Sequence, residues 1–579
     1  MNSNFITTSL FALLIFLPAL LRGGRSDLAL FFFFAVLIFY LFLRRDRRHP
    51  WVTWILAAWL LWIIIQTLFF SVVPYTSLKL LLPLAGAAIL FFAGVDWDRR
   101  EPIVIVIVAG ALLLVSIGLI FFVQSQSFGY LRLISTFFQH NAFAGFLILP
   151  IILSLWLFFE EEKWGYVLWA TAVVFLLTGF FLTFSRGGFL SLGAALLVFF
   201  IFLWRACQSA RAFVMRCGLI LFLITISALF AYSIFYAKRL EAETSGSSLA
   251  APYSHELSGE TGITSRLVYM KYAAELFRER PFIGFGLGAF ATEARRIQDD
   301  VRFFSTDPHN LYLRFAAELG GIGGILFFLF LGGVIFQACR YSLAHPHDLL
   351  FSAFFAGFSG MLIHNGGDVD FQFPANIFLF FAAAAVLVSP GSRNISESVR
   401  TRLGLSVGAA VLAAVALASL LGSYFGNRAD YKQAIRFDPF NPFLKIAYAV
   451  DAFQKQDFTK AEVLLKEAEA LHPYERRIFL LKATLLRQRG ERAAAEAAYK
   501  TALELAPFRD LEAVMGLVNV YLEERKIDEA IRIAQAALER FPQKAFESPF
   551  WVDPEKENIR NAYQGLRQFV EDSPRSRKE

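Results

Sequence analysis

Long runs of uncharged apolar residues constrain this chain more than any other feature. An α-helix needs about 20 apolar residues to cross a bilayer, and thirteen such runs lie near residues 5–22, 27–43, 51–70, 79–95, 102–123, 141–159, 164–184, 187–204, 217–236, 311–338, 349–364, 373–389 and 404–425. Only 18% of the 579 residues are charged, against about a quarter in soluble proteins. A transmembrane β-barrel would show short alternating segments instead. The sequence therefore predicts an all-α, polytopic transmembrane bundle of about 12–13 spans.

Arginines in the short loops between spans predict the orientation of the bundle. One set of loops contains Arg44, Arg45, Arg47, Arg48, Arg99, Arg100, Arg205, Arg211, Arg216, Arg393, Arg400 and Arg402, whereas the opposite set contains Arg22, Arg25, Arg132 and Arg186. The richer set marks the inner face, so we expect an inner N-terminus and an outer C-terminal tail. The net charge of +7 follows from these loops, and we expect no nucleic-acid partner.

The tail after the last span contains an internal repeat. Pro439, Pro473, Pro507 and Pro542 are 34, 34 and 35 residues apart, and Ala434, Ala468, Ala502 and Ala537 keep the same spacing. A 34-residue period with small residues where paired helices touch is typical of tetratricopeptide repeats. We therefore expect a C-terminal α-solenoid that binds a protein partner, with a simple spacer as the alternative.

The predicted spans and the repeat divide the chain into four parts. Residues 1–236 contain N-terminal transmembrane helices, and residues 237–310 form a polar loop on the outer face. Residues 311–425 contain the C-terminal transmembrane helices, and residues 426–579 form the repeat region. Because most of the chain lies in the membrane, the polar loop is the expected place for chemistry.

Three outer-face residues are the main candidates for that chemistry. Arg186 lies in the sequence FSRGG between two spans, and Arg266 begins an amphipathic stretch in the polar loop. Two guanidinium groups offer forked donors for phosphate oxygens. His309, followed by Asn310 in DPHNLYLRF, lies where the loop re-enters the membrane, and a histidine at such a rim can act as a general base. Taken singly, each also fits a plain alternative: an interfacial arginine, a solvated helix face and a helix cap.

Two further histidines are weaker candidates for substrate binding. His140 opens a span at the same predicted depth, and His364 precedes Asp368 and Asp370 in HNGGDVDFQFP. His140 also fits an interfacial cap, and the acidic pair would permit metal ligation, although a cation site needs more converging carboxylates. We therefore expect no metal and no cofactor. Arg314 and Glu318 are one helical turn apart, and we expect them to pair with each other.

The order of three motifs resembles the O-antigen ligase and O-antigen polymerase superfamily. These are SRGG, then an arginine followed by RPFIGFGLGAF, then HNLYLRFAAELGGIGG, and the resemblance extends over roughly residues 80–390. It implies a GT-C-like helical fold in the bacterial inner membrane, with a multi-pass chain and a periplasmic tail. It also implies that Arg186 and Arg266 hold the diphosphate of an undecaprenyl-diphosphate-linked glycan and that His309 activates the acceptor, without a metal.

The resemblance implies a glycosyltransferase that moves a glycan to an acceptor hydroxyl. The acceptor could be lipid A core in a ligase, another repeat unit in a polymerase, or a protein hydroxyl in an O-oligosaccharyltransferase. The alternative from another class is a polysaccharide transporter or flippase with a docking tail. Transporters commonly place charges near the membrane midplane, and the predicted spans here are nearly free of them.

Overall fold

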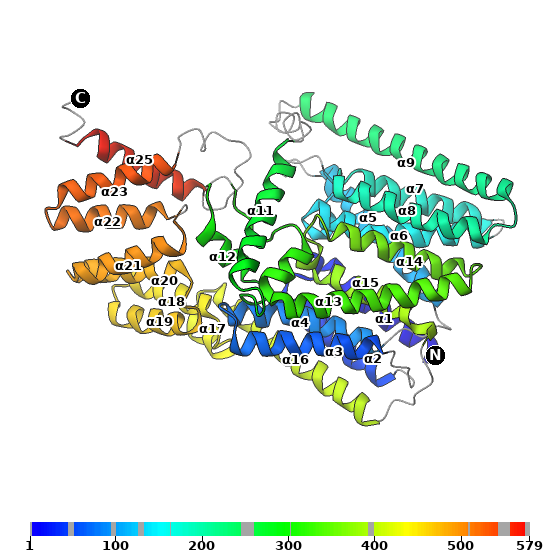
Figure 1. The fold of residues 1–579 in the computed structure, drawn as a ribbon, viewed down its shortest axis with the longest axis horizontal. Coiled ribbons are helices and arrows are strands. Elements are labelled where there is room, and N and C mark those ends of the chain that lie inside the picture. The colour runs from blue at the N-terminus through cyan, green and yellow to red at the C-terminus, as the bar shows by residue number, and fades with distance from the viewer. Residues whose placement is uncertain are drawn as a thin grey trace.

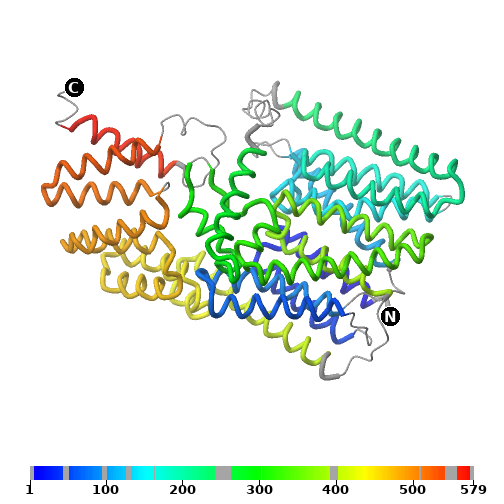
Figure 2. The backbone as a smooth tube through the Cα atoms, in the orientation of Figure 1, coloured from blue at the N-terminus to red at the C-terminus, as the bar shows by residue number. Residues whose placement is uncertain are grey.

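The computed structural model describes residues 3–43, 51–93, 100–124, 132–161, 164–244, 260–300, 303–391, 399–507, 510–541 and 556–573, and within these ranges every regular element is a helix. A helical bundle and a helical solenoid lie side by side, with α11 (Glu260–Glu279) and α12 (Phe290–Ile297) between them (Figure 1). Figure 2 shows the same arrangement as a backbone trace, with the solenoid on one side of the insert and the bundle on the other.

The thirteen predicted spans each correspond to one helix of the bundle. These helices are α1 (Ser3–Leu20), α2 (Asp27–Leu43), α3 (Val52–Phe69), α4 (Pro74–Ala93), α5 (Arg100–Gln124), α6 (His140–Glu160), α7 (Trp164–Phe181), α8 (Arg186–Ala206), α9 (Ala210–Thr244), α13 (Leu311–Ala344), α14 (Leu349–His364), α15 (Pro374–Val388) and α16 (Val399–Gly426). Within the described residues, nine are long and apolar enough to cross a membrane, and α1, α2, α14 and α15 give shorter apolar helices. The predicted all-α bundle is confirmed.

Parts of the sequence interpretation lie outside the described residues. Arg44, Arg45, Arg47, Arg48, Arg99, Arg393 and Pro542 belong to this group. Which face of the bundle lies on the inner side of the membrane therefore stays a prediction.

The ninth span is longer than the sequence pattern indicated. The polar loop was expected to begin at residue 237, but α9 continues as a helix through Thr244. Lys238 explains part of this extension, because its ammonium group donates to the carbonyl of Val123 at 2.7 Å and to Glu241 at 2.9 Å. The ammonium group of Lys238 is thus hydrogen-bonded on the side of α9, and the helix continues past this residue.

Two glycines let the polar insert pack directly against the kink of α13. Gly284 has φ +67° and Gly320 has φ +68°, and residues other than glycine rarely adopt such positive φ values. A Cβ on Gly284 would lie 2.4 Å from the carbonyl oxygen of Glu318, and a Cβ on Gly320 would lie 2.2 Å from that of Phe282. The amides of Phe285 and Gly286 donate to the carbonyls of Ala317 and Glu318 at 3.2 and 2.8 Å. The predicted tight turn at GFGLG is therefore part of an interface between backbones.

The solenoid consists of helix pairs at the predicted period. Three pairs, α18 (Pro442–Gln454) with α19 (Phe458–Leu471), α20 (Arg476–Gln488) with α21 (Arg492–Leu505) and α22 (Leu511–Glu523) with α23 (Ile527–Arg540), follow the short α17 (Tyr431–Phe437), and α25 (Lys556–Glu571) packs after them. The first helices of the pairs begin 34 and 35 residues apart. The repeated alanines Ala434, Ala468, Ala502 and Ala537 are all buried. The predicted α-solenoid fold is confirmed.

The solenoid is held against the bundle by polar and aromatic contacts at its first helices. The hydroxyl of Tyr75, at the start of α4, donates to Asp438 at 2.6 Å, and its ring meets Phe443 edge-on at 6.3 Å. Helix α12 of the insert also contacts α21. The first turn of α4 and the insert are thus placed against the solenoid.

We expect Gly320→Ala to destabilise the protein. The new methyl group would meet a backbone carbonyl, and a non-glycine residue held in a strained conformation costs about 1–3 kcal/mol. The measurement is the midpoint of thermal unfolding of the purified chain in detergent. Gly324→Ala is the matched control on the same helix, because its Cβ would meet nothing within 4 Å. Equal midpoints for the two variants would contradict the assigned role of Gly320.

Candidate active site

Several chain segments meet at one end of the bundle. The first residues of α6, α8 and α13, the last turn of α14 and the turn that follows it supply the polar groups. The amide of Leu311 donates to the carbonyl of Asn365 at 2.9 Å, which joins the start of α13 to the end of α14. Helix α11 of the insert adds Arg266 through the ion pair described next.

An ion pair between Arg266 and Asp368 lies at the centre of this group. Arg266 Nη2 is 3.1 Å from Asp368 Oδ2, although the two residues are 102 positions apart. The carboxylate is fully buried, whereas the arginine side chain is 29% exposed. Asp368 also accepts the amide of Val369 at 2.9 Å. A buried carboxylate therefore holds a partly accessible guanidinium in place.

His309 lies next to this ion pair in a strained conformation. Its φ is +55°, which is uncommon for a residue with a side chain and often marks a functional position. Its backbone amide donates to Asp307 at 2.8 Å, and its ring stacks on Tyr269 with centroids 5.8 Å apart. Nδ1 is buried and has no hydrogen-bond partner among the described residues. The ring is thus held in position while one nitrogen stays available.

The surroundings of His309 favour the neutral imidazole. Burial lowers the pKa of His309 below its usual value of 6.5, and the positive charge of Arg266 adds to the lowering. The carboxylates of Asp368 and Asp307 oppose it. A neutral imidazole is the form that can accept a proton.

A buried charge cluster supports the backbone around His309. Arg314, on the first turn of α13, contacts Asp307 at 3.0 Å and Glu318 at 3.1 Å, and all three side chains are buried. The expected pairing of Arg314 with Glu318 is confirmed, and Asp307 is the additional member. Because Asp307 also accepts the amide of His309, the cluster connects α13 directly to the candidate base.

His364 forms a second arrangement with Asp370. Its Nδ1 is 2.7 Å from Asp370 Oδ2, both side chains are buried, and Nε2 has no partner among the described residues. A Cβ placed on Gly187 would lie 3.7 Å from His364 Nε2 and 3.8 Å from Asp368. Within the described chain, the acidic residues after His364 therefore pair with a histidine and an arginine.

The other predicted site residues occupy different positions around this centre. His140, at the start of α6, lies 2.6 Å from Arg132 and also interacts electrostatically with Asp368 and Arg266. Arg186 begins α8 with an exposed side chain, directly before Gly187. Asn310 caps α13 through the amide of Leu313 at 2.9 Å and donates to the carbonyl of Gly366 at 2.9 Å. Both ends of the Asn310 amide are thus used to hold the site together.

Three of the eight non-glycine residues with positive φ in the described chain lie at or beside predicted site residues. Phe138, two positions before His140, has φ +54°, and Phe184, two positions before Arg186, has φ +51°. His309, with φ +55°, is the third of these residues. Backbone strain persists only where the surrounding structure enforces it, so these three segments are tightly specified.

Sequence reasoning missed three members of the site. Asp307, Arg132 and Tyr269 carried no spacing signal, because each acts through a partner brought near by folding. Asp307 could have been suspected from its place two residues before His309, since an aspartate commonly accepts the amide two residues on. The role of Asp368 as the partner of Arg266 had no sequence signal.

Comparison with known proteins supports a ligase-type domain. Residues 171–328 match the O-antigen ligase family model. This stretch contains Arg186, Arg266, His309 and Asn310, whereas His140 and His364 lie outside it. The match confirms the predicted resemblance for this part of the chain and supports a ligase- or polymerase-type function.

Comparisons over the whole chain add little to this assignment. No curated protein matches the chain. The crystal structure of the yeast Tom70 aligns over 80% of this chain and 97% of its own at 14% identity, with a TM-score of 0.19. The likeness of the tail to tetratricopeptide repeats rests on the spacing of its helices.

We expect Asp307→Ala to destabilise the protein by about 3 kcal/mol, because losing one member of a buried ion pair leaves an uncompensated charge. The measurement is the thermal unfolding midpoint in detergent. Glu279→Ala is the control, since Glu279 pairs with Arg296 on the exposed surface of the same insert, where a pair contributes less than about 1 kcal/mol. A loss as small as that of the control would mean that the cluster does not support the site.

Proposed function

We propose that this chain is a glycosyltransferase of the bacterial inner membrane that uses an undecaprenyl-diphosphate-linked glycan as donor. It would transfer the glycan to an acceptor hydroxyl at the periplasmic face, where the C-terminal solenoid would also lie. The O-antigen ligase family match at residues 171–328 supports the reaction class. The membrane-type helices support a lipid-linked donor.

The observation that carries the proposal is the position of His309 beside Arg266. His309 presents a buried ring nitrogen without a partner, and burial favours its neutral form. Arg266 is the nearby cation, and its guanidinium offers five N–H donors, of which one bonds Asp368. A base next to a partly accessible cation is the minimum arrangement for attack by a hydroxyl on a sugar diphosphate.

The transfer step follows from this arrangement. A ring nitrogen of His309 takes the proton of the acceptor hydroxyl as that oxygen bonds to the anomeric carbon of the donor. The bond between this carbon and the diphosphate oxygen breaks, and its electron pair leaves with the diphosphate. Attack from the face opposite the leaving group inverts the anomeric configuration. Fixed cations stabilise the departing charge without reorganising during the reaction.

The arginines of the site would bind the diphosphate in different ways. Arg266 is oriented by the buried Asp368 carboxylate before the donor arrives, so little of its side-chain freedom would be lost on binding. Arg186 lies exposed at the start of α8, beside Gly187 and its neighbour His364. We propose that Arg266 contacts the diphosphate from within the site and that Arg186 contacts it from the rim, with His140 and His364 lining the path.

The solenoid would bring the second reactant or a protein partner to the same end of the bundle. Its first helices contact the start of α4, and α21 contacts α12 of the insert. Stacked helix pairs present an extended surface that is suited to binding a partner. This position would place a docked molecule next to the insert.

We expect His309→Ala to reduce glycan transfer by about 10²–10⁴-fold, the usual contribution of a general base. A deletion strain complemented with each variant is read for surface glycan and for accumulated undecaprenyl-linked glycan. Arg266→Gln should show the same defect, because it removes the charge that stabilises the leaving group. Accumulated single repeat units would identify a polymerase, whereas long accumulated chains would identify a ligase.

The matched control is His347→Ala, an exposed histidine in the turn after α13. It should leave glycan transfer unchanged. Normal surface glycan in the His309 and Arg266 variants would refute the proposed chemistry and favour a transporter.

The transfer rate should depend on pH through His309. The neutral form is the base and the pKa is lowered, so the rate should be constant above pH 6.5 and fall only at lower pH. The measurement is the pH profile of kcat/KM with purified protein. Asp368 opposes the lowering, so Asp368→Asn should move the inflection further down. An inflection above pH 7 would exclude His309 as the base.

A further inference from the structure

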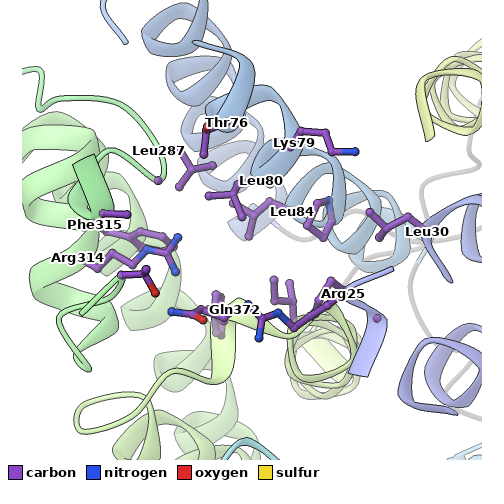
Figure 3. A pocket seen from close by; sticks show the side chains of 18 of the residues that line it. Arg25, Leu30, Thr76, Lys79, Leu80, Leu84, Leu287, Arg314, Phe315 and Gln372 are labelled. Atoms are coloured by element: carbon purple, nitrogen blue, oxygen red, sulfur yellow. The ribbon is translucent and has the colours of Figure 1, made fainter. Parts of the chain in front are cut away.

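A separate cavity of about 400 Å³ lies beside the candidate site. Helix α4, the loop before α2, the start of α12, the start of α13 and the segment before α15 enclose it. Figure 3 shows Arg25 and Gln372 reaching into it from one side, with Leu80 and Leu84 opposite. The proposed transfer mechanism does not use this space.

Residues that line the cavity contact or adjoin residues of the candidate site. Arg314 lines the cavity and binds Asp307, which accepts the backbone amide of His309. Phe371 and Gln372 line it too, and they directly follow Asp370, the partner of His364. The cavity wall is therefore linked to His309 through the Arg314–Asp307 ion pair, and to His364 through the residues that follow Asp370.

The charged groups of the cavity are not equally available. Lys79 is paired with Asp27 at 2.5 Å, and Arg314 is paired with two carboxylates. Arg25 stands over the ring of Phe373 at 5.0 Å and has no carboxylate partner among the described residues. The side-chain amide of Gln372 makes no hydrogen bond within the described chain. Thr76 and Thr306 add hydroxyl groups to the lining, and among the described lining residues Arg25 is the cation without a carboxylate partner.

Most of the remaining wall of the cavity is apolar. Leu30, Leu80, Leu84, Phe315, Phe371 and Ile377 supply it. A small hydrated anion would leave such a surface uncovered, whereas an amphiphile would place its charge at Arg25 and its apolar part against these side chains. Arginine is well suited to the charged end, because its fork matches phosphate oxygens.

We infer that this cavity binds the phosphate-bearing headgroup of an amphipathic lipid, with Arg25 as the ion partner and Gln372 as a second donor. The apolar wall favours a phosphorylated lipid over a free phosphate ion.

The test measures binding to the full purified chain in an uncharged detergent. The probes are dioctanoyl phosphatidic acid, the matched uncharged dioctanoylglycerol and inorganic phosphate, and the readout is the Kd from native mass spectrometry. We expect phosphatidic acid to bind more tightly than either of the other probes. Arg25→Gln should weaken that binding roughly tenfold or more, the usual effect of losing a charge-assisted hydrogen bond, and Arg25→Lys should restore part of it.

Arg22→Gln is the matched control, since Arg22 lies in the same loop but stands over Phe138 at 5.9 Å and outside the cavity. The Kd for phosphatidic acid should change by less than about twofold, because Arg22→Gln removes no hydrogen bond to the bound lipid. Equal binding of the uncharged lipid, equal binding of inorganic phosphate, or an unchanged Kd in Arg25→Gln would each overturn the inference.

A transfer assay separates this inference from the proposed function. If His309→Ala kept full transfer activity, the proposed chemistry would be refuted, but charge-dependent lipid binding at Arg25 would still support the cavity assignment. Loss of that binding would remove only the cavity assignment.

Discussion

The candidate site depends on one buried guanidinium. Arg314 joins Asp307 to Glu318, and Glu318 also accepts the amide of Phe290 at the start of α12. Asp307 in turn accepts the amide of His309. Because a buried charge is tolerated only when it is paired, these contacts form together, and the insert, α13 and the candidate base take up one arrangement.

Close packing of the insert backbone against α13 positions this charge cluster. Gly284 and Gly320 allow the insert to lie on the kink of α13, where Trp62 of α3 donates to the carbonyl of Leu319 at 2.9 Å. Side chains at these two positions would separate the insert from the membrane helices. The glycines therefore act at a distance from the chemistry by fixing where Arg266 of α11 can reach.

The membrane helices and the solenoid have different roles in the proposed reaction. The bundle supplies fixed cations, histidines and a cavity with an apolar wall, while the solenoid lies against the same end. A transporter would place charges along its path through the membrane, whereas here the charged groups gather at the ends of helices. This distribution fits a reaction at a membrane surface.

The sequence by itself determined the helices, the repeat period and the main candidate residues, because each depends on local composition or spacing. Apolar runs predicted the thirteen bundle helices, the 34-residue spacing predicted the paired helices of the tail, and the motifs around Arg186, Arg266 and His309 predicted the family resemblance. Only the tertiary structure decided how distant side chains pair. Arg266 meets Asp368 across 102 positions, and Arg25 reaches the same cavity as Gln372. Such pairings have no local signature, since they follow from how the helices pack.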